Sequence, residues 1–254
     1  MVPFGGSVRL PQELIGFLDP PTVDEKQYWK GGVWNGCLLM FPDDYDNGID
    51  PSGKFGYLPS FYSFNVNGEN NPYCPREGNE IVGLTQDKQL LLDKIDNFSR
   101  SDGTGTGLAA AWGVATISRG FRGVFPNVPN NMPWRFRDYR RKIVVLMSDG
   151  GISPLNFPRA VDFDTNLPFQ SSALDSTIRT RDEQATAQNK VCDRAKSLGI
   201  EIYTIGLQIS NTESVTRLKN CATSDSHFYE AGIGDLGEAF ETIAGQVSAV
   251  RISE

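Results

Sequence analysis

The sequence predicts an α/β protein with a doubly wound, mainly parallel sheet. Two apolar runs, residues 143–147 and 201–208, carry this prediction. Each run is short and rich in β-branched residues, as is typical of strands buried on both faces, and helices must then cover both faces of the sheet. From Leu84 onward, segments with helical spacing of apolar residues alternate with these strands. We therefore expect one domain, residues 1–254.

Five segments are predicted to be helices, each with a stripe of apolar residues at helical spacing. Thr85 is the expected N-cap of the first helix, whose apolar face is Leu91, Ile95 and Phe98. The third begins with a capping box, Thr180 and Glu183, and is expected to stop at Gly199. The second, fourth and fifth have stripes that include Leu108, Ala111, Trp112 and Ala115, then Val215 and Leu218, then Leu236, Phe240, Ile243, Val247 and Val250.

Residues 19–79 have a different character, because they are rich in Pro, Gly, Asn and Asp and hold no regular period for long. We interpret this stretch as an irregular insertion within the domain. Cys37 and Cys74 bracket most of it, and a bond between them would stabilise the chain by roughly 4 kcal/mol. The alternative is two buried free thiols. A second long loop is expected over residues 151–178.

Composition excludes several classes of function. The net charge of −7 argues against nucleic acid as a partner. No apolar run approaches the roughly 20 residues that span a bilayer, and no signal peptide is visible after Met1. The single histidine, His227, is not near other good metal ligands, which argues against a zinc site and against most histidine-based catalysis.

Asp149 is the first candidate binding residue, because it directly follows the strand at 143–148. The carboxyl ends of parallel strands form the edge where ligands and ions bind in such sheets. Thr104, in the glycine-rich loop 103–107, could add a hydroxyl ligand, and hydroxyl with carboxylate suits magnesium or calcium. Alternatively, Asp149 merely caps a turn. A phosphate cradle at 103–107 is disfavoured, because no strand leads into the loop and no Lys-Ser or Lys-Thr pair follows it.

Two further segments contain residues that could form a site, but both are interpreted as structural. Residues 50–54 superficially match Asp-x-Ser-Gly, but no apolar strand precedes them and Lys54 would repel a cation, so they are interpreted as a turn. A basic cluster could form a binding patch, but a solvated loop is the preferred interpretation; its members are Arg135, Arg137, Arg140, Arg141 and Lys142.

Taken together, these motifs resemble the von Willebrand factor A domain. The resemblance rests on Leu146-Met-Ser-Asp-Gly, on Gly103-Thr104 with Trp112-Gly113 downstream, and on Gly199-Ile-Glu-Ile-Tyr-Thr-Ile. More narrowly, the ordered set is similar to the TadG-type proteins of tight-adherence (Flp) pilus assembly. The matching segments are Val2-Pro3-Phe4, Trp34-Asn-Gly-Cys37, Tyr73-Cys74-Pro75, the helix start at Leu84-Thr85, Cys192 with Lys196-x-x-Gly-Ile, Asn220-Cys-Ala-Thr-Ser and Val250-Arg251-Ile.

The resemblance implies a Rossmann-like fold and a metal-ion-dependent adhesion site. In that site one strand ends in Asp-x-Ser-x-Ser, a loop supplies a threonine and a later strand supplies an aspartate. Thr104 matches the loop threonine and Asp149 the late aspartate, whereas Asp-x-Ser-x-Ser has no match in this sequence. Mg²⁺ or another divalent cation is expected in the complete domain, and this chain need not hold one.

The missing motif leads us to expect an N-terminally truncated domain. In the resembled fold the strand with Asp-x-Ser-x-Ser lies in the middle of the sheet, beside the strand at 143–148. Without it, residues 143–148 should pair with residues 201–207 on one side and with no regular strand on the other. Such an unpaired apolar edge is a template for association with another chain.

The four cysteines allow three pairings. The resemblance implies Cys37–Cys74 and Cys192–Cys221, and each of these pairs closes a local loop. Disulfides fit an oxidising compartment. The expected location is therefore extracytoplasmic, in the periplasm or cell envelope, with membrane attachment only through an anchor upstream of this chain.

The resulting hypothesis is a non-enzymatic adhesion or assembly module of a pilus-associated envelope protein. It would bind a protein partner through an incomplete metal-ion-dependent adhesion site. One alternative is a metal-dependent hydrolase that uses Asp149, but the sequence pairs no general base with it and contains no nucleophile elbow. The other is a structural envelope module whose metal site has decayed.

Overall fold

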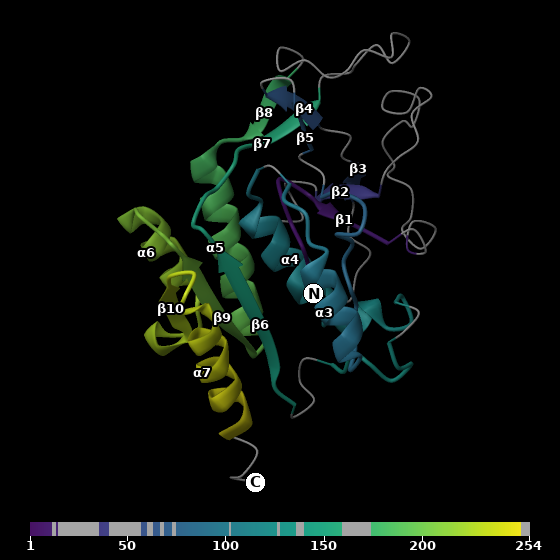
Figure 1. Ribbon diagram of the computed structural model, residues 1–254, viewed down its shortest axis with the longest axis vertical. Coiled ribbons are helices and arrows are strands. Elements are labelled where there is room, and N and C mark those ends of the chain that lie inside the picture. The colour runs from purple at the N-terminus through teal and green to yellow at the C-terminus, as the bar shows by residue number, and fades with distance from the viewer. Residues whose placement is uncertain are drawn as a thin grey trace.

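The computed structural model describes residues 1–11, 14, 36–40, 57–59, 63–66, 69–72, 75–101, 103–125, 128–135, 140–158 and 174–249 (Figure 1). The helices in these ranges are α3 (Lys88–Asp96), α4 (Thr106–Thr116), α5 (Arg181–Ser197), α6 (Thr212–Cys221) and α7 (Leu236–Ala249). The strands are β1 (Val8–Arg9), β2 (Cys37–Met40), β3 (Tyr57–Pro59), β4 (Ser63–Val66), β5 (Glu69–Pro72), β6 (Lys142–Ser148), β7 (Leu155–Pro158), β8 (Leu174–Arg179), β9 (Ile200–Leu207) and β10 (Phe228–Ala231).

The central sheet has the strand order β10-β9-β6, and both of its strand pairs are parallel. In the longer pair the register runs from Lys142 opposite Ile200 to Ser148 opposite Gly206. The chain crosses from β6 to β9 through α5 and from β9 to β10 through α6. The predicted α/β class with a mainly parallel sheet is therefore confirmed.

Helices cover both faces of this sheet (Figure 1). Helices α4, α5 and α6 pack on one face, where Trp112 is fully buried and meets Phe121 edge-on with 5.9 Å between ring centroids. Helix α7 packs on the other face, where Tyr203 and Ile205 contact a smaller cluster that includes Ile243. Side chains of β9 alternate between these two clusters, as expected for a strand buried on both sides.

The predicted start signal of α5 is confirmed at the level of single hydrogen bonds. Thr180 Oγ1 accepts the Glu183 N–H at 3.3 Å, and Glu183 Oε2 accepts the Thr180 N–H at 2.7 Å, so the capping box is complete. Gly199 follows α5 with φ +78°, a backbone conformation that favours glycine. Asn211 Oδ1 caps α6 by accepting the Ser214 N–H at 2.7 Å.

The predicted N-cap of α3 is wrong. The helix starts after Asp87, whose Oδ1 accepts the Leu90 N–H at 3.0 Å, while the hydroxyl of Thr85 accepts only the Asp87 N–H. Its apolar face also stays outside the core, since no residue of α3 is buried and Ile95 is 58% exposed. Spacing predicts which residues share a face, but it does not predict what that face meets.

Short strands occupy parts of the segments that were predicted to be irregular. Within residues 19–79, β2 pairs with β1 and β3, and β4 pairs with β5, all antiparallel. Within residues 151–178, β7 pairs with β8 in a hairpin at the same end of the molecule as β4 and β5 (Figure 1). The sequence did not predict them because most are two to four residues long, which is too short for a clear period-2 pattern.

Strand β6 is an edge of the central sheet among the described strands. Its residues pair with β9 alone, as predicted for 143–148. Val145 and Met147 point to the face that carries α7, and each is 38% exposed. The interpretation as a fully buried strand is therefore wrong for this part of β6.

The disulfide Cys192–Cys221 is present and joins α5 to α6, with 5.0 Å between the Cα atoms. Both residues are fully buried in the larger core. This half of the cysteine prediction is confirmed. Cys74 lies outside the described residues, so the pairing Cys37–Cys74 stays a prediction.

Replacing both Cys192 and Cys221 by alanine should lower the free energy of unfolding by about 2–4 kcal/mol, because the bond closes a loop with a sequence separation of 29. Guanidinium denaturation followed by circular dichroism measures the change. Reduced wild-type protein is the control that separates the lost cross-link from the lost packing of two sulfur atoms. Equal stability of the double variant and the oxidised wild type would contradict this account.

Candidate functional site

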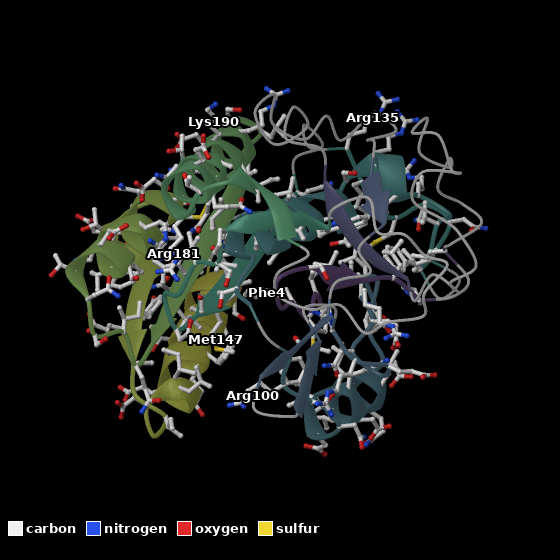
Figure 2. The ribbon with its side chains drawn as sticks, turned by 90° about the horizontal axis from the view of Figure 1, so that it is seen from above. Phe4, Arg100, Arg135, Met147, Arg181 and Lys190 are labelled. Atoms are coloured by element: carbon white, nitrogen blue, oxygen red, sulfur yellow. A yellow bond between two sulfur atoms is a disulfide. The ribbon has the colours of Figure 1, made fainter. Side chains whose placement is uncertain are left out.

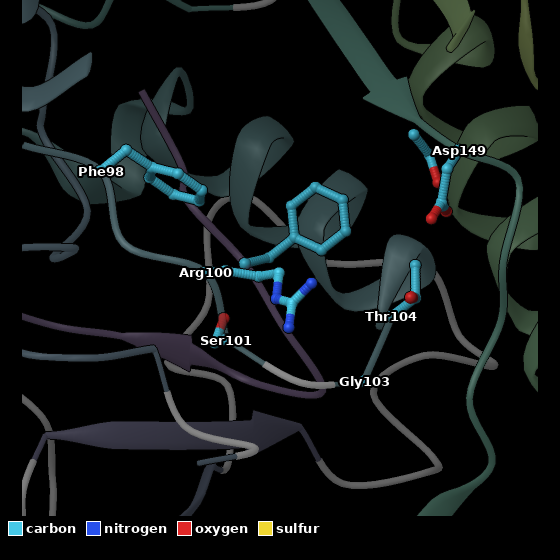
Figure 3. A pocket seen from close by; sticks show the side chains of 8 residues that line it. Phe98, Arg100, Ser101, Gly103, Thr104 and Asp149 are labelled. Carbon is cyan, nitrogen blue, oxygen red and sulfur yellow. The ribbon is translucent and has the colours of Figure 1, made fainter. Parts of the chain in front are cut away.

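A pocket of about 500 Å³ lies at the carboxyl end of β6 (Figure 3). It gathers residues from the N-terminal turn, from the segment after α3, from the loop before α4 and from the end of β6. They are Phe4, Phe98, Arg100, Ser101, Gly103, Thr104, Ser148 and Asp149. The structure thus brings both candidate ligands, Thr104 and Asp149, to one pocket at the carboxyl edge of the sheet, where parallel α/β folds place their ligands.

The Thr104 and Asp149 side chains converge on Gly151. A Cβ atom placed on Gly151 would lie 3.2 Å from Asp149 Oδ1 and 3.4 Å from Thr104 Oγ1. The Gly151 N–H also donates to Asp149 Oδ1 at 3.0 Å, which orients the carboxylate. The hydroxyl and the carboxylate therefore face the same small volume from two different segments of the chain.

The main chain around Thr104 is fixed by two neighbouring segments. The Thr104 N–H donates to Ser153 Oγ at 2.9 Å, and the Thr104 carbonyl accepts the Ser153 N–H at 3.0 Å. The Gly105 N–H donates to the Gly5 carbonyl at 2.7 Å, and a Cβ on Gly105 would lie 3.1 Å from the Gly6 carbonyl oxygen. Close approach to the N-terminal turn thus explains a glycine at position 105.

Helix α6 braces the turn that carries Asp149. The Gly150 carbonyl accepts hydrogen bonds from Ser214 Oγ, at 2.6 Å, and from Arg217 Nη2. Burial lowers the pKa of Arg217, and nearby Glu213 acts in the opposite direction. Arginine is not deprotonated in proteins, so the guanidinium stays charged, and a charged donor strengthens the bond to Gly150.

Sequence reasoning missed Ser214 and Arg217, although one signal was available. The buried face of α6 comprises Ser214, Arg217, Leu218 and Cys221, a helical spacing of 3, 4 and 7 from the first residue. Two polar residues within a buried stripe need hydrogen-bond partners inside the protein. Here the partner is the Gly150 carbonyl, which only the folded chain brings within reach.

Arg100 is a second residue that the sequence did not single out. It lies on the pocket wall with Phe98, across from Asp149 (Figure 3). Its guanidinium has no hydrogen-bond or ion-pair partner among the residues that the structure describes. The pocket therefore presents an unpaired positive group beside an aromatic ring and opposite a carboxylate.

The donor set matches a hard cation only in part. Asp149 supplies one carboxylate and Thr104 one hydroxyl, while Ser148 Oγ already accepts the Gly150 N–H at 3.1 Å. Within the described ranges, no group of three or more His, Cys, Asp or Glu side chains could hold a metal ion. Mg²⁺ takes six oxygen ligands, so water or another molecule would have to supply most of them. The positive charge of the Arg100 guanidinium also disfavours binding of a metal cation in this pocket.

The predicted basic cluster is built into the fold rather than left as a free patch. Arg141 Nε donates to Glu201 Oε1 at 2.7 Å, and Arg140 stacks 3.9 Å from the centre of the Trp134 ring. Lys142 Nζ donates to the carbonyls of Ile117 and Trp134. Arg140 and Arg141 remain exposed, as the interpretation as a solvated loop predicts, whereas Lys142 is the first residue of β6. Arg137 and residues 50–54 lie outside the described residues.

No family model and no curated protein matches the chain. A solved structure, the vWF domain of the type V pili tip protein Mfa5 from Porphyromonas gingivalis, is similar with a TM-score of 0.46 and 17% sequence identity. The match covers 67% of this chain and 76% of that chain. Among the described residues, the helices are all too short or too polar to cross a membrane.

The substitution Gly150→Ala should destabilise the protein by about 1–3 kcal/mol. Gly150 has φ +83°, and a Cβ there would lie 2.6 Å from Ser214 Cβ, so α6 would have to move away from the turn. Urea denaturation measures the loss. Gly237→Ala in α7 is the matched control, because its Cβ would meet nothing within 4 Å, and its stability should be unchanged or slightly raised. A Gly150→Ala protein as stable as the wild type would show that the turn is not held as described.

Proposed function

We propose that this chain is a non-enzymatic adhesion or assembly module of a pilus-associated envelope protein, and that it binds a protein partner at the pocket beside Asp149. The observation that carries the proposal is the convergence of Thr104 and Asp149 at the carboxyl edge of a parallel sheet. The ordered motifs that resemble the TadG-type proteins support the same assignment.

The chemistry of the pocket wall favours a partner with mixed side chains. Phe4 and Phe98 offer apolar contact, Arg100 a positive charge and Asp149 a negative one. Protein surfaces combine these groups within one patch, and aromatic and arginine residues are enriched where proteins bind one another. The alternative of a hydrolase has less support, because Asp149 is the only carboxylate among the described residues that line the pocket, and no histidine or cysteine is among them.

The disulfide supports an extracytoplasmic location for the module. Cys192–Cys221 lies between two helices of the core, and disulfides persist in oxidising compartments such as the periplasm and the cell surface. A divalent cation is a proposed component of the site, with Thr104 and Asp149 as its ligands from this chain. The small number of ligands leads us to expect weak binding.

Titration with MgCl₂ and MnCl₂ in a calorimeter tests the cation. We expect a Kd weaker than about 1 mM for this chain, since Asp149 is the only carboxylate among the described residues that line the pocket. Asp149→Asn should abolish the heat of binding, whereas Glu230→Gln, an exposed carboxylate on β10, should leave it unchanged. Binding that survives both Asp149→Asn and Thr104→Val would place the cation elsewhere.

A photoreactive amino acid at position 101 tests the protein partner, because Ser101 lines the pocket and forms no hydrogen bond with the described residues of the Asp149 turn. In intact cells we expect a cross-link to one envelope protein that is absent when the same group stands at the exposed position of Ile233. Turnover of a chromogenic phosphate or ester substrate with Mn²⁺, lost in Asp149→Asn, would instead identify an enzyme.

A further inference from the structure

The free edge of β6 is a ready acceptor for another strand. Each residue from Lys142 to Ser148 has a partner position on β9, and none of Ile143 to Ser148 has a further strand partner in the described part of the chain. In a parallel strand the main-chain groups point alternately to the two neighbours, so about half of those in β6 face the free edge. An unpaired row of N–H and C=O groups is a template for strand addition.

Apolar side chains flank this edge. Val145 and Met147 project on the α7 face and remain partly exposed, whereas Leu146 is buried on the α4 face. Figure 2 places Met147 on the side of the molecule that carries α7. An added strand would therefore find apolar neighbours on one face and main-chain partners along its length.

The pocket at the end of β6 limits what can occupy the edge. Figure 3 shows Asp149 on one side of this pocket and Phe98 and Arg100 on the other. An extended chain that pairs with β6 in the parallel direction would reach this pocket with its carboxyl end. Arg100, unpartnered within the described ranges, offers that chain a charge to pair with.

We propose that β6 accepts an extended segment of a partner protein as an additional parallel strand. The segment carries an apolar side chain toward Val145 and Met147 and a carboxylate at its carboxyl end, which pairs with Arg100. A parallel direction brings the carboxyl end of the segment to the pocket, whereas an antiparallel segment would bring its amino end. This inference rests on the proposed function in that the ligand is a protein, and it adds the chemistry by which that ligand is recognised.

A peptide with the sequence of residues 200–207 serves as the probe. This segment already pairs in parallel with β6 on the other side, with Gly206 opposite Ser148. Added in the same register, its free carboxylate would follow Ser148 by one residue and lie beside the pocket. By fluorescence anisotropy we expect saturable binding, about tenfold weaker for the C-terminally amidated peptide. A peptide N-methylated at alternate amides should not bind.

Substitutions on the protein separate strand addition from unspecific association. Arg100→Glu and Val145→Lys should each weaken binding of the peptide about tenfold or more, and Arg100→Lys should retain most of it. Ile233→Lys is the control, because Ile233 is an exposed apolar residue outside β6, at 73% exposure. Val145 does not line the pocket with Thr104 and Asp149, so calorimetric binding of Mg²⁺ to the Val145→Lys variant tests that site separately.

Hydrogen exchange decides the inference. In the chain alone, alternate amides of residues 143–148 should exchange rapidly while those of β9 are protected, and the peptide should slow the rapid set. Protection of all β6 amides without peptide, protection that rises with protein concentration, or peptide binding that leaves β6 unchanged would each overturn it. A cross-link from position 101 that persists in Val145→Lys would reject strand addition while leaving the proposed function intact.

Discussion

The parallel pairing of β6 with β9 is the interaction on which the candidate site depends. The register places Gly206 opposite Ser148, so the turns that follow the two strands leave the sheet at the same level. Helix α6 starts after the second turn and reaches the first through Ser214 and Arg217. A slip of one residue would turn every β6 side chain to the opposite face and would separate Asp149 from this brace.

The same pairing explains the small residue at the end of β9. A Cβ on Gly206 would collide with Ile209, which folds back over the strand and belongs to the larger core. Any larger residue at position 206 would therefore require the Ile209 side chain to move out of this position.

Local rules predicted the parts of the fold that depend on neighbours in sequence. The capping box at Thr180, the stop at Gly199 and the strands around Val144 and Tyr203 all follow from spacing, and the structure confirms them. The meeting of Thr104 with Asp149 was also anticipated, because the carboxyl ends of strands and the loops before helices share one edge in parallel folds.

The features that the sequence did not predict depend on the path of the chain in three dimensions. Arg100 enters the pocket only because the segment after α3 passes the end of β6, and α3 leaves its apolar face outside the core. The free-energy cost of burying Arg217 is offset by its hydrogen bond to the Gly150 carbonyl, which is 67 residues away in the sequence. Such contacts join segments that are distant in sequence, so neither periodicity nor local composition predicts them.

The disulfide at Cys221 restrains the helix that holds the candidate site. Helix α6 is fixed at its start by the Asn211 cap and at its end by the bond to Cys192, and between them it holds the Gly150 carbonyl. A ten-residue helix tethered at both ends has little freedom to fray. The turn with Asp149 is consequently ordered when the chain folds, and a molecule that arrives later loses less conformational entropy on contact with a preorganised surface.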